Sequence, residues 1–377
     1  MVKSANPWLR GLLRAGKQQR ATARALTVLF AAPKPKPKPK SKPKAVRLTA
    51  AAPAAVTPRP KPKPAAISPV AVVPPGGKWL ASHFSGRADD GHGALRRMAY
   101  WLYLPTTAPP AAGWPLVVML HGCDQSATLF AQGTRMNQWA EKLGYAVLYP
   151  QQSVSAHPHR CWKWYDRATQ QGGGDVSVIV GMVEKISGQY RFDRARIYIC
   201  GLSAGAGMAH IVALNHPKLF AAVGLHSGPS YGAGHSTIGA LGVMKHGDSY
   251  RVDRAIEEVL AQRPGFPGMP TMLVQGEDDD VVRPINQAHL TRQSMLLNRL
   301  PHGTAVDVTA RAGNRTVNPH RVHDVYRDRT LVLRVAQVAK LAHAWSGGDA
   351  SLSYNNGTGP DASKMLLDFF ARHRRGG

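Results

Sequence analysis

Apolar residues follow two patterns from about residue 76 to the end of the chain. Short uninterrupted apolar runs, typical of buried strands, alternate with segments whose apolar residues repeat at helical spacing. The sequence predicts strands at 97–104, 115–120, 145–149, 196–200, 219–225 and 271–275, and helices at 136–143, 175–190, 204–215 and 365–373. Strands that alternate with helices indicate an α/β protein with a mostly parallel, doubly wound sheet.

The first 75 residues lack both patterns. Residues 1–30 form a basic amphipathic segment, and residues 31–75 consist largely of alternating Lys and Pro with Ala and Val. Proline removes backbone donors and fixes φ, so residues 31–75 should be an extended, disordered linker without a core. The expected organisation is therefore 1–30, 31–75 and a folded domain at 76–377.

Positive charge is concentrated in the same leading segment. The chain contains 48 Lys and Arg against 22 Asp and Glu, a formal net charge of +26. Sixteen of the cations lie between Lys3 and Lys63, and Asp89 is the first acidic residue. The excess charge therefore belongs to a basic Lys/Pro-rich tail and predicts no specific nucleic-acid function for the folded domain.

Membrane and export signals are weak. No run of eighteen or more apolar residues is present, so the sequence predicts no transmembrane segment. Residues 25–32 form a short apolar run behind a long basic segment, which loosely imitates a secretory signal. The alternative is an amphipathic helix at 7–30 that rests on a lipid or polymer surface. A cytoplasmic or granule-associated location is favoured over export.

The chain contains three cysteines, too few for a disulfide scaffold. Cys200 ends an apolar run that reads as a buried strand, which favours an inert core thiol. Cys123 and Cys161 fall in predicted loops and could form a bridge, but their spacing alone leaves the pairing open.

Residues 201–205 carry a G-x-S-x-G pattern directly after a predicted strand and directly before a predicted helix. Such a tight turn exposes the hydroxyl of Ser203 at the sheet edge, and the helix aims its amide groups at developing negative charge. Residues 228–232 match the same pattern but lead into a segment rich in Gly, His and Ser. Ser203 is therefore the candidate nucleophile, and Ser230 is interpreted as a loop serine.

A nucleophilic serine requires a base and an acid that orients the base, and in this arrangement the acid precedes the histidine. The strand at 271–275 ends in the acidic cluster 277–280, which suits the acid but leaves the choice of carboxylate open. His343 follows an apolar stretch and precedes a Gly-rich segment, which favours it as the base. The competing histidines lie in polar segments: His226, His320 and His323.

Two backbone amides are candidates for binding an oxyanion. One is the amide of Ala204, directly after the serine, and the other is that of Cys123, after the strand at 115–120. The aromatic residues Trp162, Trp164 and Tyr165 alternate nearby, and two readings stay open: ordinary core, or the lining of an ester-binding groove. Trp345, two residues after His343, is a further candidate for contact with the substrate.

Five segments together resemble the catalytic domain of poly(3-hydroxybutyrate) depolymerase family esterases, relatives of feruloyl and acetylxylan esterases. The resemblance runs from about residue 97 to residue 370. The matching motifs are Leu-His-Gly-Cys at 120–123 with Gln125, Cys-Trp-Lys-Trp-Tyr at 161–165, Gly-Leu-Ser-Ala-Gly at 201–205, Gly-x-x-Asp-x-x-Val at 276–282 with Pro284 and Asn286, and His-Ala-Trp-x-Gly-Gly at 343–348.

This resemblance implies an α/β-hydrolase fold with a catalytic domain at 76–377. It implies Ser203 as nucleophile, His343 as base and Asp279 as the acid. It also implies an oxyanion hole made by the Cys123 and Ala204 amides, and it favours a bridge between Cys123 and Cys161. The choice of Asp279 within the acidic cluster comes from the resemblance.

The expected function is hydrolysis of short-chain poly- or oligo-(3-hydroxyalkanoate) esters, without a metal or organic cofactor. Secreted depolymerases often carry a polymer-binding domain after the catalytic domain, whereas this chain ends soon after its last predicted helix. A short intracellular type of depolymerase, or an esterase of soluble oligomers, is therefore expected. The alternatives are a feruloyl or acetylxylan esterase, and a protein that binds granules, nucleic acid or another anionic surface through residues 1–75.

Overall fold

The computed structural model describes residues 76–87, 95–301 and 303–376. The segments predicted at 1–30 and 31–75 lie outside the described residues. Within the described residues, no helix has the length and apolar character needed to cross a membrane.

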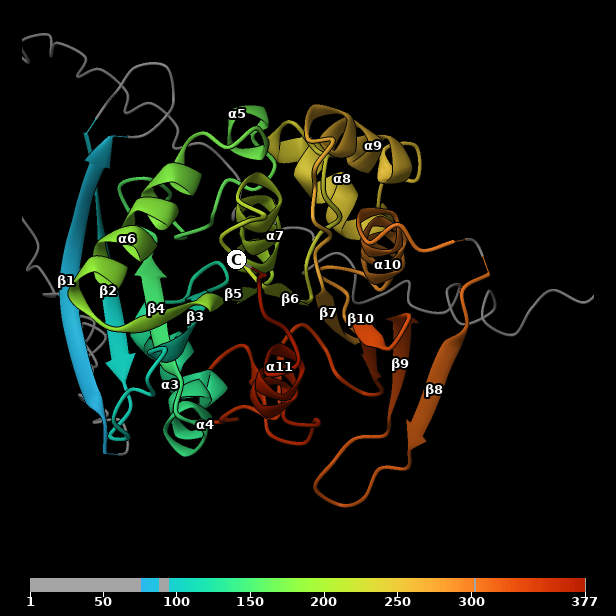
Figure 1. The fold of residues 1–377 in the computed structure, drawn as a ribbon. Coiled ribbons are helices and arrows are strands. Elements are labelled where there is room, and N and C mark those ends of the chain that lie inside the picture. The colour runs from blue at the N-terminus through green and yellow to red at the C-terminus, as the bar shows by residue number, and fades with distance from the viewer. Residues whose placement is uncertain (1–75, 88–94, 302, 377) are drawn as a thin grey trace, which may run out of the picture.

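One ten-stranded sheet runs through the molecule in the order β1-β2-β4-β3-β5-β6-β7-β10-β9-β8 (Figure 1). Its six central strands, from β4 to β10 in that order, are parallel, and both edges are antiparallel. The strands are β1 (Lys78–Arg87), β2 (Leu95–Leu104), β3 (Trp114–Leu120), β4 (Ala146–Gln151), β5 (Phe192–Leu202), β6 (Ala222–His226), β7 (Thr271–Gly276), β8 (Val306–Arg311), β9 (His320–Arg327) and β10 (Thr330–Val338). The predicted mostly parallel sheet is confirmed.

Helices cover both faces of the sheet (Figure 1). Helices α6 to α10 lie on one face, together with the short α5, and helices α3, α4 and α11 lie on the other. The helices are α3 (Ala127–Thr134), α4 (Met136–Leu143), α5 (Arg167–Gln170), α6 (Asp175–Gln189), α7 (Ala204–Asn215), α8 (Thr237–His246), α9 (Val252–Gln262), α10 (Ile285–Leu297) and α11 (Ala362–Phe370). This is the doubly wound arrangement expected from the sequence.

Each face has its own buried apolar cluster. Ile179 of α6 and Val212 of α7 belong to the first cluster, and Phe130 of α3 and Phe370 of α11 belong to the second. The parallel strands between the two clusters contribute side chains to both, which explains why β3 and β7 are buried nearly throughout.

The carboxyl ends of the parallel strands meet at one edge of the sheet. Strands β5, β6, β7 and β10 are successive neighbours, so the residues that follow them lie together. A small parallel sheet of β11 (Trp345–Ser346) and β12 (Asn355–Asn356) follows β10. This edge is the place where open parallel sheets bind their ligands.

Candidate active site

Ser203 occupies a tight turn between β5 and α7. Its φ of 57° lies in the left-handed region that non-glycine residues rarely adopt. A Cβ on Gly205 would lie 2.1 Å from the Leu120 carbonyl oxygen, and one on Gly201 would lie 2.4 Å from the Gly205 carbonyl carbon. The two glycines therefore allow the turn to pack against the end of β3, and they keep Ser203 at the sheet edge.

The backbone amide of Ser203 is hydrogen-bonded, whereas its side-chain hydroxyl is not bonded to any described residue. Its amide donates a hydrogen bond to the His226 carbonyl oxygen at 2.9 Å, which joins the turn to the end of β6. The residue is 8% exposed. Within the described residues its hydroxyl makes no hydrogen bond. Transfer of its proton to a base therefore requires the two groups to approach, as catalytic groups often do when substrate binds.

Ser230 has a different setting. It lies in the irregular segment between β6 and α8, and α8 begins only at Thr237. The residue is 2% exposed, and its hydroxyl has no hydrogen-bond partner in the part of the chain that the structure describes. The second G-x-S-x-G match therefore lacks the strand-to-helix turn that would present a nucleophile.

Asp279 and His343 form a hydrogen-bonded pair. The His343 Nδ1 atom lies 2.8 Å from Asp279 Oδ2, and Gln275 Nε2 donates to the same oxygen at 2.9 Å. The other oxygen, Oδ1, accepts hydrogen bonds from the Val281 and Val282 amides at 3.0 and 2.9 Å. Both carboxylate oxygens are thus held in place.

Burial distinguishes Asp279 from the other members of the acidic cluster. Asp279 is 2% exposed, whereas Glu277, Asp278 and Asp280 are exposed. Burial alone would raise the pKa of Asp279, but the charge and hydrogen bond of His343, the Val282 amide and the Ser227 hydroxyl together hold its pKa below the usual value. The carboxyl group is therefore ionised at neutral pH and able to orient an imidazole.

The competing histidines occupy other positions. His320 and His323 lie on β9, and strand β10 lies between β9 and β7, the strand that leads to Asp279. His226 ends β6 beside the pair, but it is 1% exposed and burial lowers its pKa to about 3, so its ring is neutral. Of these histidines, only His343 is bonded to the carboxylate of Asp279.

The loop after β3 places the Cys123 amide beside the serine turn. Gly122 packs so closely that a Cβ added to it would lie 3.5 Å from the Cβ of Ser203. Within the described residues no acceptor takes the Cys123 N–H, and the Ala204 N–H belongs to the first turn of α7, where amides lack partners inside the helix. Both amides are thus available to an oxyanion.

His121 orients the loop after β3, a role that was not predicted from the sequence. Its Nε2 atom accepts a hydrogen bond from the Gln152 amide at 3.1 Å, so the ring proton must lie on Nδ1, 2.7 Å from the Gly122 carbonyl oxygen. Burial lowers the pKa of His121 to about 4, which keeps the ring neutral. The Gly122 carbonyl and the Cys123 N–H belong to one planar trans peptide, so holding the oxygen points the N–H the opposite way.

Replacing His121 with Phe should therefore reduce kcat for ester hydrolysis by about tenfold to a hundredfold, with a smaller effect on KM. The ring would still fill its buried space, but the Gly122 carbonyl would lose its donor and the Cys123 N–H its fixed direction, and losing one such N–H typically costs about a hundredfold or more. Steady-state kinetics on p-nitrophenyl butyrate give the comparison. An unchanged kcat in a folded variant would contradict this role.

Cys123 and Cys161 form a disulfide in the structure, and Cys200 is a buried free thiol. The bridge joins the loop after β3 to the segment that contains Trp162 and Trp164. Trp162 donates its indole N–H to the His121 carbonyl oxygen at 2.9 Å, which adds a second connection between the two segments. The loop that carries the Cys123 amide is thus anchored on both sides.

Removing this bridge should lower stability. It closes a loop with a sequence separation of 38, and the chain-entropy relation gives about 4 kcal/mol for a loop of that length. The double substitution Cys123→Ser with Cys161→Ser should therefore lower Tm by several degrees, as should a reductant on the wild-type protein. Cys200→Ala is the matched control, because it leaves the bridge intact. If reductant left the wild-type Tm unchanged, the bridge would not stabilise the protein.

Most of the aromatic residues suggested as substrate contacts are buried. Trp162 and Trp345 are 0% exposed and Trp164 is 2% exposed, so a bound substrate could reach none of them without rearrangement. Trp345 stacks on the His226 ring, with centroids 4.9 Å apart. The structure thus places these three side chains behind the site, whereas Tyr165 is partly exposed and remains a candidate for contact.

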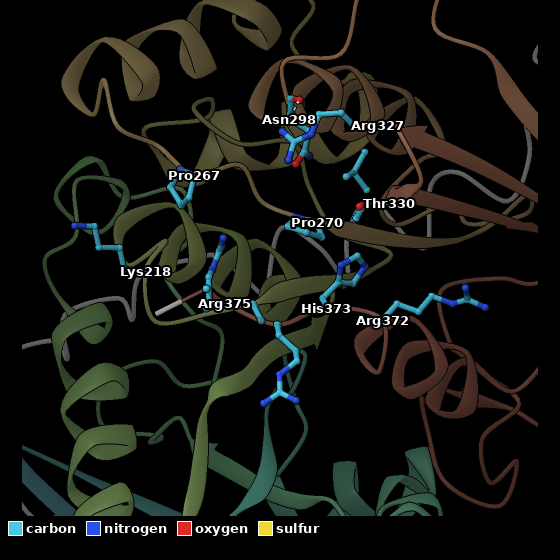
Figure 2. A pocket seen from close by; sticks show the side chains of 13 residues that line it. Lys218, Pro267, Pro270, Asn298, Arg327, Thr330, Arg372, His373 and Arg375 are labelled. Carbon is cyan, nitrogen blue, oxygen red and sulfur yellow. Dashed lines mark hydrogen bonds between the residues drawn. The ribbon is translucent and has the colours of Figure 1, made fainter. Parts of the chain in front are cut away.

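A cavity of about 630 Å³ lies at the opposite edge of the sheet (Figure 2). Its lining includes Ala221, Pro270 and Thr330, which stand at the amino ends of β6, β7 and β10. Several cations also line it, but Lys218 and Arg372 point away from each other in Figure 2. The cavity is therefore separate from the Asp279–His343 edge of the sheet.

Sequence relatives of this chain include acetylxylan esterases and a depolymerase. Acetylxylan esterase A from Talaromyces purpureogenus is 33% identical over 155 residues, which covers 41% of this chain and 38% of that protein. Poly(3-hydroxyalkanoate) depolymerase C from Paucimonas lemoignei is 31% identical over 199 residues, covering 51% and 46% respectively. The chain thus spans about half, or less, of the length of these relatives.

A solved acetyl xylan esterase from Aspergillus awamori covers 78% of this chain and 99% of its own, with a TM-score of 0.59 and 20% identity. At this identity the likeness shows a shared α/β-hydrolase fold and nothing beyond the fold. The family model described as esterase PHB depolymerase matches residues 98–319, more than half of the chain. The chain therefore belongs to the esterase PHB depolymerase family.

Proposed function

We propose that this protein is a carboxylic ester hydrolase in which Ser203 is the nucleophile, His343 the base and Asp279 the acid that orients the base. The observation that carries the proposal is the hydrogen bond between His343 and the buried Asp279 carboxylate, which lies at the same edge of the sheet as the strained Ser203 turn. The relatives named as acetylxylan esterases and as a depolymerase support the same reaction class.

In the first half of the reaction, Ser203 Oγ attacks the ester carbonyl carbon while His343 Nε2 takes the hydroxyl proton. Asp279 accepts the Nδ1–H bond and stabilises the imidazolium ion that forms. The negative charge on the carbonyl oxygen is held by the Cys123 and Ala204 amides. When the intermediate collapses, His343 returns the proton to the leaving alkoxide, the alcohol departs, and Ser203 carries the acyl group.

In the second half, His343 takes a proton from a water molecule whose oxygen attacks the acyl carbon. Collapse of this intermediate releases the carboxylic acid and returns the proton to Ser203 Oγ. Every step uses side chains and amides of the chain itself. The reaction consumes one water molecule for each ester bond and needs no oxidant or reductant.

The proposed substrates are poly- or oligo-(3-hydroxyalkanoate) esters with short chains. The family match and the depolymerase relative support this choice. Acetylated xylan is the second candidate, since several relatives are named acetylxylan esterases. The basic residues 1–75 are proposed to hold the enzyme at a granule or another anionic surface, through contacts that weaken as salt increases.

A serine-directed phosphonate and a substrate panel test the proposal together. The phosphonate should block hydrolysis of p-nitrophenyl butyrate, and peptide mapping should find the phosphonyl group on Ser203. The unmodified enzyme should then release acid faster from 3-hydroxybutyrate oligomers than from acetylated xylan. Label on another serine would contradict the site, and the reverse preference would support the acetylxylan substrate.

A further inference from the structure

His226, at the carboxyl end of β6, contacts the surroundings of all three proposed catalytic residues. Its carbonyl oxygen accepts the Ser203 amide at 2.9 Å. Its Nε2 atom accepts the Ser346 amide at 3.1 Å, on the segment three residues beyond His343. Its Nδ1 atom lies 3.2 Å from the hydroxyl oxygen of Ser227. One buried residue therefore links the nucleophile turn to the loop of the base.

These contacts fix the position of the ring proton. The Ser346 backbone N–H can only donate, so His226 Nε2 must carry a lone pair. The ring is fully buried, and a neutral ring with a bare Nε2 has its proton on Nδ1. Nδ1–H therefore donates to Ser227 Oγ. The stacked ring of Trp345 holds this orientation from the side.

The direction of the next hydrogen bond follows from the first. A hydroxyl has one proton to donate, and the Ser227 oxygen already accepts from His226, so its proton is free to point at another acceptor. The neighbouring acceptor is the Asp279 carboxylate, whose pKa the Ser227 hydroxyl helps to lower. Ser227 is 0% exposed, and its amide donates to the Val274 carbonyl oxygen of β7 at 2.9 Å, which fixes it beside the strand that leads to Asp279.

We propose that His226 and Ser227 form a positioning pair that donates in sequence, from His226 Nδ1–H to Ser227 Oγ and from Ser227 O–H to the Asp279 carboxylate. The pair orients the acid toward His343 while the backbone and Nε2 contacts of His226 hold the Ser203 turn and the His343 loop. This inference depends on the proposed triad. Neither residue touches the reacting atoms, so both act through Asp279.

The polarity of the pair predicts the direction of a pH effect. The Ser227 hydroxyl presents its positive end to the Asp279–His343 pair, which disfavours an added proton there. Without the hydroxyl, the pair should take up a proton at higher pH, and the acid limb of activity should move upward. The other titratable groups that act on the pair are His226, which stays neutral, and Lys245 of α8, and both are still present when Ser227 is substituted.

Two substitutions of Ser227 separate positioning from stability. Both Ser227→Ala and Ser227→Gly remove the hydroxyl, but Ser227 has a φ of 49°, which glycine adopts without strain. The glycine variant should therefore be at least as stable as the alanine variant. If the hydroxyl positions Asp279, both variants should lose kcat by a similar factor of about ten, with KM little changed and the acid limb raised by about half a pH unit.

Ser230→Ala is the matched control. It also removes a buried hydroxyl from the segment after β6, but that hydroxyl has no hydrogen-bond partner in the described part of the chain, so the wild-type kcat and pH profile are expected. Nitrogen NMR of the wild-type protein provides a second measurement, in which His226 should show a protonated Nδ1 and a bare Nε2.

Three results would overturn the inference. The first is a wild-type kcat and pH profile in both Ser227 variants, and the second is a proton on Nε2 of His226. A rate loss that follows Tm, large in the alanine variant and absent in the glycine variant, would likewise assign Ser227 a purely structural role. Failure of the triad itself is recognised separately, because Ser203→Ala would then retain activity whatever the Ser227 variants do.

Discussion

Replacing Ser203 with Ala should lower kcat for p-nitrophenyl butyrate by a factor of about 10⁵ to 10⁶, the loss typical of removing a serine nucleophile. The alanine Cβ keeps the backbone environment of the turn, and the hydrogen bond from the backbone N–H of residue 203 to the His226 carbonyl oxygen is unaffected. Because the hydroxyl makes no hydrogen bond within the described residues, its removal should leave Tm nearly unchanged. Initial rates and a thermal melt measure the two effects.

The other serine with a G-x-S-x-G match provides the control for that prediction. Ser230→Ala removes a hydroxyl of the same kind from the segment between β6 and α8, and activity should be retained. If Ser230→Ala abolished hydrolysis while Ser203→Ala retained it, the nucleophile would be misassigned. If both variants retained wild-type rates, the proposed acyl-enzyme reaction would be wrong.

The sequence predicts five of the six central parallel strands, because these strands contain runs of buried apolar residues; β10 was not predicted. The helices predicted at 136–143 and 204–215 have the same bounds as α4 and α7. Helix α10 was not predicted, since several of its buried residues are polar: Asn286, Gln287 and Gln293. Their side chains donate hydrogen bonds to backbone groups of neighbouring elements, which allows polar residues to be buried. The buried face of this helix therefore shows no apolar repeat in the sequence.

The edge strands were missed for a related reason. All six residues of β8 are exposed, and β9 contains mostly polar residues, so neither has the apolar run of a central strand. β1 pairs only with β2 and lies at the other edge. Such strands are specified by pairing with a neighbour, and a pattern within one segment cannot show that pairing.

In the candidate site too, residues that are adjacent in the sequence can be predicted, whereas contacts between distant segments cannot. The turn at Ser203 is visible in the sequence because its glycines and serine are adjacent, and the spacing reflects a local backbone requirement. The choice of Asp279 among four neighbouring acidic residues depends on the Gln275 side chain and on two amides that fold back on the carboxylate. The buried positions of Trp162 and Trp345 likewise depend on segments distant in sequence.

Replacing Asp279 with Asn should lower kcat by about 10⁴-fold, as expected when the acid of such a triad loses its charge. Asparagine has one acceptor oxygen, and the Val281 and Val282 amides require it at the Oδ1 position. The amide NH₂ would then occupy the place of Oδ2 and face His343 Nδ1. His343 could pair with that NH₂ only by moving its proton to Nε2, where the ring can no longer accept the Ser203 proton.

The loss of kcat should persist across the pH range, because it arises from the changed tautomer of His343 and not from a shifted pKa. In the wild-type protein the pKa of Asp279 lies below its usual value, so the carboxylate stays ionised as the pH falls toward the acid limb of activity. Asp278→Asn is the matched control: it changes charge equally one residue away, and its side chain is exposed. The two variants should differ in kcat by about four orders of magnitude. If they were equally active from pH 6 to pH 9, Asp279 would not be the orienting acid.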